Sequence, residues 1–86
     1  MIIQLFSSQA SKIDDYINAQ TIVVLIQDGV YACKNILNQY PDCEIYALDR
    51  DWHAAGLETN IACQLLSDQE WVLLCSKHSP IISLQD

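Results

Sequence analysis

The sequence predicts a three-layer α/β/α fold around a mostly parallel five-stranded sheet. Strand-like and helix-like segments alternate along the chain, which favours a parallel sheet covered by helices on both faces. The run TIVVLIQ at residues 21–27 is apolar and β-branched almost throughout, as is typical of strands buried on both faces. The 86 residues are 51% hydrophobic with two glycines and two prolines, which suits a single domain over residues 1–86.

The first strand is predicted at residues 2–6, which are mainly apolar. Ser7 and Ser8 follow it, and a serine hydroxyl can cap a helix. We therefore expect a helix near residues 9–19. Its apolar positions recur at helical spacing: Ile13, Tyr16 and Ile17. The second strand is the apolar run at 21–27.

Asp28 is predicted to cap the next helix, at residues 29–40, because aspartate is a preferred N-cap residue. Pro41 ends this helix, since a proline restricts the residue before it to extended conformations. One face of the helix is apolar, with Val30, Cys33, Leu37 and Tyr40. The segment CEIYAL at 43–48 then predicts the third strand.

Asp49 is expected to cap a short helical segment at residues 49–57, DRDWHAAGL. Gly56 lies near its end, where glycine commonly terminates a helix in a left-handed conformation. The apolar segment at 61–66 is the predicted fourth strand.

The clearest helix start in the chain is Ser67-Asp68-Gln69-Glu70, which fits the capping-box pattern. Behind it, four residues are spaced to form one inward stripe: Trp71, Leu74, Cys75 and His78. Ser79-Pro80 ends the helix, and residues 81–84 form the last predicted strand.

The net charge of −7, from eleven acidic and four basic residues, argues against direct binding to nucleic acid, because such binding depends largely on Lys and Arg neutralising phosphates. The basic residues are scattered singly: Lys12, Lys34, Arg50 and Lys77. The apolar run 22–26 is too short to span a bilayer, and MIIQLFSSQ lacks the pattern of a signal peptide. We therefore expect a cytoplasmic protein without a membrane segment.

Four cysteines are present, Cys33, Cys43, Cys63 and Cys75, without a C-x-x-C pair or a zinc pattern. We expect neither a metal nor a cofactor, and thiols that are buried as small hydrophobic groups. Cys33 is the fifth residue of the predicted helix and lies on its core face. A core thiol is the favoured interpretation, and a reactive thiol at Cys33 is the alternative.

Asp28-Gly29 could suggest a phosphate-binding turn, because it follows an apolar strand. A phosphate loop needs further glycines or a following Lys-Ser/Thr, which this sequence lacks. Asp28 would also repel a phosphate at the same amides. We interpret the pair as a strand-to-helix junction.

A second candidate site follows the third strand, where Asp49, Arg50, Asp51, Trp52 and His53 gather charged and aromatic side chains. Ligands in open α/β sheets bind at the carboxyl ends of strands. One interpretation is a capped surface turn with Trp52 packed inward. The other is a partner-facing patch, because Trp and Arg are common interface anchors.

His78 could act as a general base, but the sequence places no nucleophile as its evident partner. Its position in the last helical turn favours a structural role. We therefore predict no catalytic residues from spacing alone.

Three segments together resemble the DsrH/TusB family of sulfur-relay proteins: VVLIQDGVYA at 23–32, IYALDRDWHAAGL at 45–57 and DQEWVLLCSKHSPIISL at 68–84. The family pattern has three parts in order. The first is an apolar strand that ends in Q/E-D-G-[VI]-x-A, and the second is a strand and turn with the pattern [VL]-Y-[AV]-L-x-x-D. The third is a terminal helix that often has Lys-His near its end. The resemblance covers essentially the whole chain and implies a DsrEFH-like fold.

The resemblance also implies partners and a role. It points to a heterohexamer with DsrE/TusD-like and DsrF/TusC-like subunits, which passes persulfide sulfur from a TusA-like carrier to a TusE-like acceptor. The sulfur then serves either 2-thiouridine synthesis at the tRNA wobble position or sulfur oxidation. In isolation, a homodimer stays an open alternative, as does a stand-alone homo-oligomeric binding domain.

In such complexes the persulfide-bearing cysteine is generally carried by the DsrE/TusD subunit, in a loop after a strand. Asp49-Arg50-Asp51 occupies the comparable loop here and contains no thiol. The first predicted helix also lacks cysteine, and Leu84 stands where some relatives have a closing Trp. We therefore predict a non-catalytic subunit of a sulfurtransferase complex, with a thiol-bearing sulfurtransferase as the alternative.

Overall fold

The computed structural model describes residues 1–58 and 63–86. Five parallel strands form one sheet in the order β4-β3-β2-β1-β5. The strands are β1 (Ile2–Leu5), β2 (Ile22–Leu25), β3 (Glu44–Leu48), β4 (Gln64–Leu66) and β5 (Ile81–Leu84). The parallel five-stranded sheet is confirmed. In the described part of the predicted fourth strand, pairing begins at Gln64, and residues 61 and 62 lie outside the described residues.

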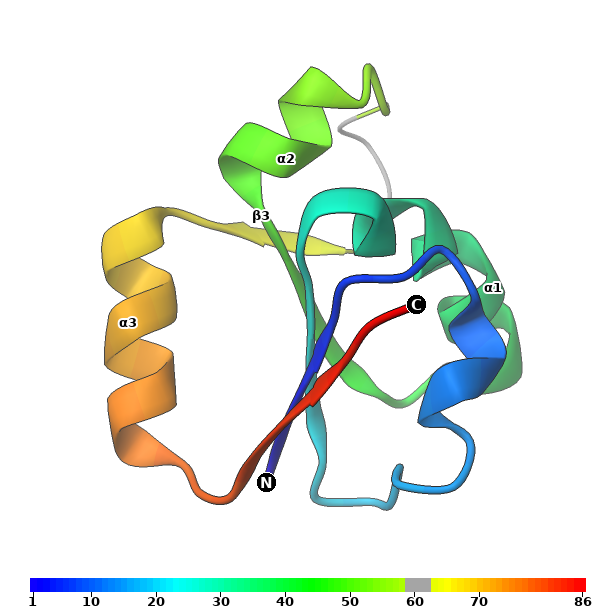
Figure 1. The fold of residues 1–86 in the computed structure, drawn as a ribbon, viewed down its shortest axis with the longest axis vertical. Coiled ribbons are helices and arrows are strands. Elements are labelled where there is room, and N and C mark those ends of the chain that lie inside the picture. Colours follow the sequence, from blue (N-terminus) through cyan, green and yellow to red (C-terminus); the bar gives the residue numbers. More distant parts are fainter. Residues whose placement is uncertain (59–62) are drawn as a thin grey trace.

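Helical segments cover both faces of the sheet, as predicted. Figure 1 shows α1 and α3 on opposite sides of the sheet. The helical segments are the 3-10 helices η1 (Ala10–Ile13) and η2 (Gln27–Ala32), and the α-helices α1 (Cys33–Gln39), α2 (Asp49–Ala54) and α3 (Asp68–Lys77). The chain therefore forms a three-layer α/β/α structure.

The two faces of the sheet bury unequal amounts of apolar surface. The face covered by η1, η2, α1 and α2 holds the larger core, in which Ile13, Val30, Ile36 and Trp52 pack on strand residues. The other face packs against Trp71, Leu74 and Cys75 of α3. None of the ten residues of α3, all of which the structure describes, is buried.

The helix predicted at residues 9–19 is wrong beyond its first turn. After η1 the chain forms turns, in which the backbone N–H groups of Tyr16 and Ile17 both donate to Ile13 O. The Asn18 N–H then donates to Thr21 Oγ1 at 3.0 Å, and Asn18 Oδ1 accepts from the Gln20 N–H at 2.8 Å. Asn and Thr side chains that bond to nearby backbone groups compete with helical hydrogen bonds, which explains why the helix does not continue to residue 19.

The predicted helix at 29–40 is divided into η2 and α1, and the predicted cap at Asp28 is wrong. The N-cap position of η2 is Ile26, without a side-chain cap. Gln27 takes a left-handed conformation with φ of 54°. Its N–H donates to Asp51 Oδ2 at 2.8 Å. The carboxylate for this donor therefore comes from a distant part of the chain.

Asp49 is likewise not a cap, because the N-cap position of α2 is Leu48. Asp49 is instead the first helical residue, where a carboxylate is also favourable. Gly56 follows α2 with φ of +70°, which confirms the predicted glycine-terminated end.

The capping box at the start of α3 is confirmed. Ser67 Oγ accepts from the Glu70 N–H at 3.1 Å, and Glu70 Oε1 accepts from the Ser67 N–H at 2.9 Å. These bonds lower the pKa of the Glu70 carboxyl. The predicted inward stripe is confirmed for Trp71, Leu74 and Cys75, which pack against the sheet. The placement of His78 in the last helical turn is wrong, because α3 ends at Lys77 and the backbone of His78 is extended.

Candidate functional site

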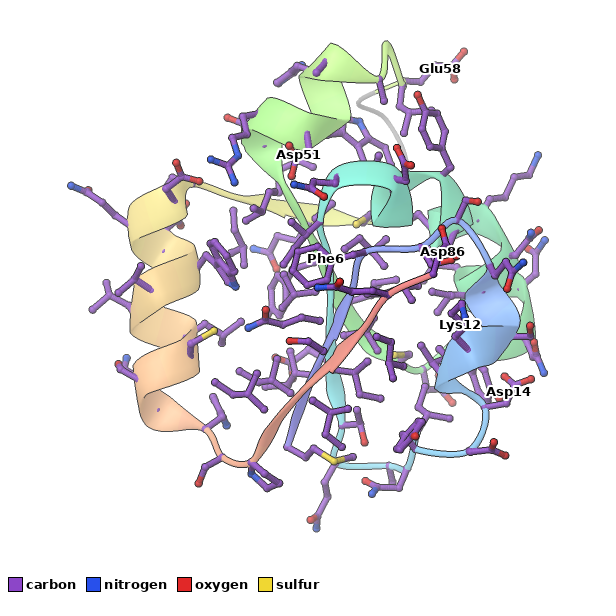
Figure 2. All side chains as sticks on the ribbon, viewed as in Figure 1. Phe6, Lys12, Asp14, Asp51, Glu58 and Asp86 are labelled. Carbon is purple, nitrogen blue, oxygen red and sulfur yellow. The ribbon has the colours of Figure 1, made fainter. Side chains whose placement is uncertain are left out.

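The candidate site lies where β2 and β3 end. These strands are neighbours, so the segments that follow them, η2 and α2, meet at one edge of the sheet. Asp51 and Glu58 lie in this part of the molecule (Figure 2). The contact between Asp51 and the backbone of Gln27 joins the two candidate segments identified from the sequence.

The charged side chains of this edge contact one another. Arg50 Nε lies 3.6 Å from Asp51 Oδ1, and Arg50 Nη1 lies 3.4 Å from Asp68 Oδ2 at the start of α3. His53 Nε2 lies 2.7 Å from Asp49 Oδ1. The side chains of Asp49, Arg50 and His53 are 51%, 57% and 58% exposed, whereas that of Asp51 is 16% exposed. Three of the five predicted residues are therefore accessible to a partner.

Trp52 lies inside the protein and is 2% exposed. Its indole Nε1 donates to the backbone oxygen of Glu58 at 3.0 Å. The ring packs in the larger core together with Val30 and Ile36. Trp52 therefore supports the segment from within, as the packing alternative describes.

Cys33 also lies in the larger core, at 2% exposed, and Cys63 lies there at 8%. All four cysteines are free. The neighbouring Cys63 thiol lowers the pKa of Cys33, against the opposing effect of burial. The neighbouring Cys33 thiol and, to a smaller extent, burial raise the pKa of Cys63. Cys33 is the first residue of α1, not the fifth residue of a longer helix as predicted.

The partnership of Cys33 with Cys63 was not predicted from the sequence. The two residues are far apart in the chain, and cysteine spacing alone does not determine which thiols meet. The role of Gln27 was also missed, because a glutamine is not a residue type that predicts a left-handed conformation. The nearby Asp28-Gly29 was the available signal that the chain turns sharply here.

Two hollows flank the exposed side chain of Tyr31. One, of about 300 Å³, lies between η2 and α2. The other, of about 470 Å³, lies between α1 and the end of α2 and includes Cys33 and Lys34 in its lining. Within residues 1–58 and 63–86, no group of three or more His, Cys, Asp or Glu side chains is placed to hold a metal ion. Of the helices in these same ranges, none is long and apolar enough to cross a membrane.

The sheet, its two helical layers and the charged edge beside a buried thiol pair define a small three-layer α/β protein with cysteines in its core. The family model described as DsrH like protein matches residues 6–81. The chain therefore belongs to the DsrH-like family. A comparison with curated proteins finds no match. Family membership supports a role as a sulfur-relay subunit and, in general terms, as a component of a DsrEFH-type complex.

Proposed function

We propose that this chain is a non-catalytic subunit of a cytoplasmic sulfur-relay complex that serves 2-thiouridine synthesis at the tRNA wobble position. The main support is the chemistry of the first residues of α2, which directly follow β3. Asp49, Arg50 and Asp51 stand there without a thiol, and each makes an ion pair or hydrogen bond within the chain. A sulfur-carrying loop needs an accessible thiolate.

The charge of the chain supports a role apart from the tRNA itself. Its net charge is −7, and an acidic surface repels the phosphates of a nucleic acid. A protein carrier that delivers the sulfur removes the need for direct contact. The proposed partners are DsrE/TusD-like and DsrF/TusC-like subunits in a heterohexamer, with TusA-like and TusE-like carriers acting through them. The exposed Asp49, Arg50 and His53 are proposed to contribute to an interface with these proteins.

Co-expression tests the proposal. The tagged chain is produced together with the DsrE-like and DsrF-like chains of the same organism, and the complex is analysed by size exclusion with light scattering. We expect one particle that contains all three chains. A tagged chain that elutes alone, while the other two associate, would contradict subunit function.

The tRNA branch has its own test. In a strain that lacks this chain, we expect the 2-thiouridine content of tRNA to fall, as measured by mass spectrometry of digested tRNA. Complementation with the chain should restore it. Unchanged 2-thiouridine together with impaired sulfur oxidation would favour the sulfur-oxidation branch instead.

A second candidate function assigns sulfur transfer to Cys33 itself. It is favoured by the neighbouring Cys63 thiol, which lowers the pKa of Cys33, and by the hollow that Cys33 helps to line. Burial opposes it, because a reagent or carrier must reach the sulfur atom.

Alkylation distinguishes the two candidates. The folded chain is treated briefly with iodoacetamide, and each modified cysteine is mapped by mass spectrometry. We expect Cys43 and Cys75, which are partly exposed, to be modified before Cys33 and Cys63, which are buried. Modification of all four at similar rates in urea is the control. A Cys33 that reacts first in the folded chain would contradict the non-catalytic role.

A further inference from the structure

Two thiols from separate parts of the chain lie together in the larger core. Cys33 is the first residue of α1, and Cys63 directly precedes β4. Both belong to the same buried cluster, where they are 2% and 8% exposed. Each is the thiol that neighbours the other, and both are free. The fold therefore encloses a pair of reduced cysteines.

The pairing of β3 with β4 explains why Cys63 faces α1. Side chains alternate between the two faces along a strand, so Cys63 and Leu65 are expected on one face. Leu65 lies opposite Ala47 of the neighbouring strand. All three residues contact the larger core, to which Cys33 at the start of α1 also belongs. The sheet thus directs Cys63 toward the layer from which Cys33 projects.

The two thiols differ in how readily they ionise. Cys63 lowers the pKa of Cys33, against the opposing effect of burial. Cys33 and, to a smaller extent, burial raise the pKa of Cys63. The first thiolate of the pair therefore forms at Cys33, while Cys63 keeps its proton. The thiolate is the nucleophilic form of cysteine, and oxidant-sensing thiolates often stand beside a second cysteine that resolves the first product into a disulfide.

A small oxidant has a route to Cys33. The residue is almost fully buried, yet it lines the hollow of about 470 Å³ between α1 and the end of α2, together with Tyr31 and Lys34. Hydrogen peroxide is little larger than a water molecule, whereas a protein carrier needs a sulfur atom at the surface. The hollow therefore suits oxidation by a peroxide better than transfer to a second protein.

We propose that Cys33 and Cys63 are an oxidisable pair that forms an intramolecular disulfide with hydrogen peroxide as the oxidant. The Cys33 thiolate attacks one peroxide oxygen, the O–O bond breaks, and the departing hydroxide takes up the proton that Cys33 released. Cys33 is then a sulfenic acid. The Cys63 sulfur attacks the Cys33 sulfur, the S–O bond breaks, and hydroxide leaves with the Cys63 proton as water. Two thiols lose two electrons and two protons, and one peroxide becomes two water molecules.

The disulfide would link the start of α1 to the start of β4. Such a link stabilises the folded state mainly by restricting the unfolded chain. In a reducing compartment the pair remains as two thiols at rest, because disulfides formed there are usually transient and redox-sensing. The inference goes beyond the proposed function, since it concerns only the thiols of this chain and does not depend on any partner.

The first test uses the Cys43→Ser/Cys75→Ser double variant, in which only the core pair of cysteines remains. We expect hydrogen peroxide to remove both thiols of the folded chain, as counted with a thiol reagent after denaturation. Digestion without reductant should yield the peptides of Cys33 and Cys63 joined within one chain, and dithiothreitol should separate them. Two persistent thiols, disulfides only between chains, or equally fast formation of the bond in urea would overturn the inference.

Single replacements in the same background test the roles of the two sulfur atoms. With Cys63→Ala added, we expect Cys33 to remain as a sulfenic acid that dimedone traps, because the resolving thiol is missing. With Cys33→Ala added, we expect the thiol of Cys63 to be lost at least tenfold more slowly. Circular dichroism checks that both variants fold. The opposite order of reactivity would overturn the assignment of Cys33 as the attacking thiol.

Urea denaturation of the double variant tests whether the native structure accommodates the bond. We expect the midpoint of the oxidised chain to lie about 1 M above that of the reduced chain, and dithiothreitol to reverse the shift. An unchanged or lower midpoint would show that the fold does not hold the two thiols at bonding distance, and would overturn the inference.

Discussion

Replacement of Gly29 by alanine should destabilise the protein by at least about 3 kcal/mol, at the upper end of the usual cost of overpacking. A Cβ atom at Gly29 would lie 1.9 Å from the carbonyl oxygen and 2.8 Å from the carbonyl carbon of Leu5. Both contacts are with backbone, which no side-chain rotation relieves. Leu5 cannot withdraw easily, because β1 is bonded to β2 on one side and to β5 on the other.

The measurement is the free energy of unfolding from urea denaturation, followed by circular dichroism. Gly56→Ala is the matched control. Gly56 has φ of +70° with nothing within 4 Å of an added Cβ, so alanine there costs only the left-handed strain of about 1–2 kcal/mol. If the two substitutions lowered the free energy of unfolding equally, the close approach of η2 to β1 would not be the reason that position 29 requires glycine.

Truncation of Trp52 to alanine should cost about 3–5 kcal/mol, the usual range for removing a buried aromatic side chain. The ring is 2% exposed in the larger core. Trp52→Phe should cost about 1–3 kcal/mol, because it keeps an aromatic ring but removes the donor that bonds to Glu58 O. Both values come from the same urea titration.

Trp71→Phe is the control for the loss of an indole N–H. Trp71 Nε1 is buried and has no acceptor among the residues that the structure describes. Removal of an unsatisfied donor carries little penalty, so we expect a change within about 1 kcal/mol. If Trp71→Phe lowered the free energy of unfolding as much as Trp52→Phe does, the cost of Trp52→Phe could not be assigned to its hydrogen bond with Glu58 O.

The strands were predictable because their signal is local. The apolar run at 21–27 and the alternation of segments fixed a parallel sheet, and the five strands follow in the expected order along the chain. The capping box of Ser67 and Glu70 was predictable for the same reason, since both partners lie within one helical turn. Gly56 belongs to this group, because its conformation depends on a local preference.

The helix starts were less predictable, because a carboxylate after a strand can bond to more than one donor. Asp28 and Asp49 have the composition of N-caps, yet neither occupies that position. The donor at Gln27 is satisfied by Asp51, 24 residues further along the chain. A local pattern cannot specify such a pairing, which exists only once β2 and β3 lie side by side.

For the candidate site, the sequence by itself identified the segment Asp49 to His53 and the core-like character of Cys33. The tertiary structure decided which of these side chains remain available. It buries Trp52, binds Asp51 to the backbone of Gln27 and leaves Asp49, Arg50 and His53 exposed. It also brings Cys63 to Cys33. Residue types and periodicity determine the elements, whereas partners far apart in the sequence are determined only when the sheet brings them together.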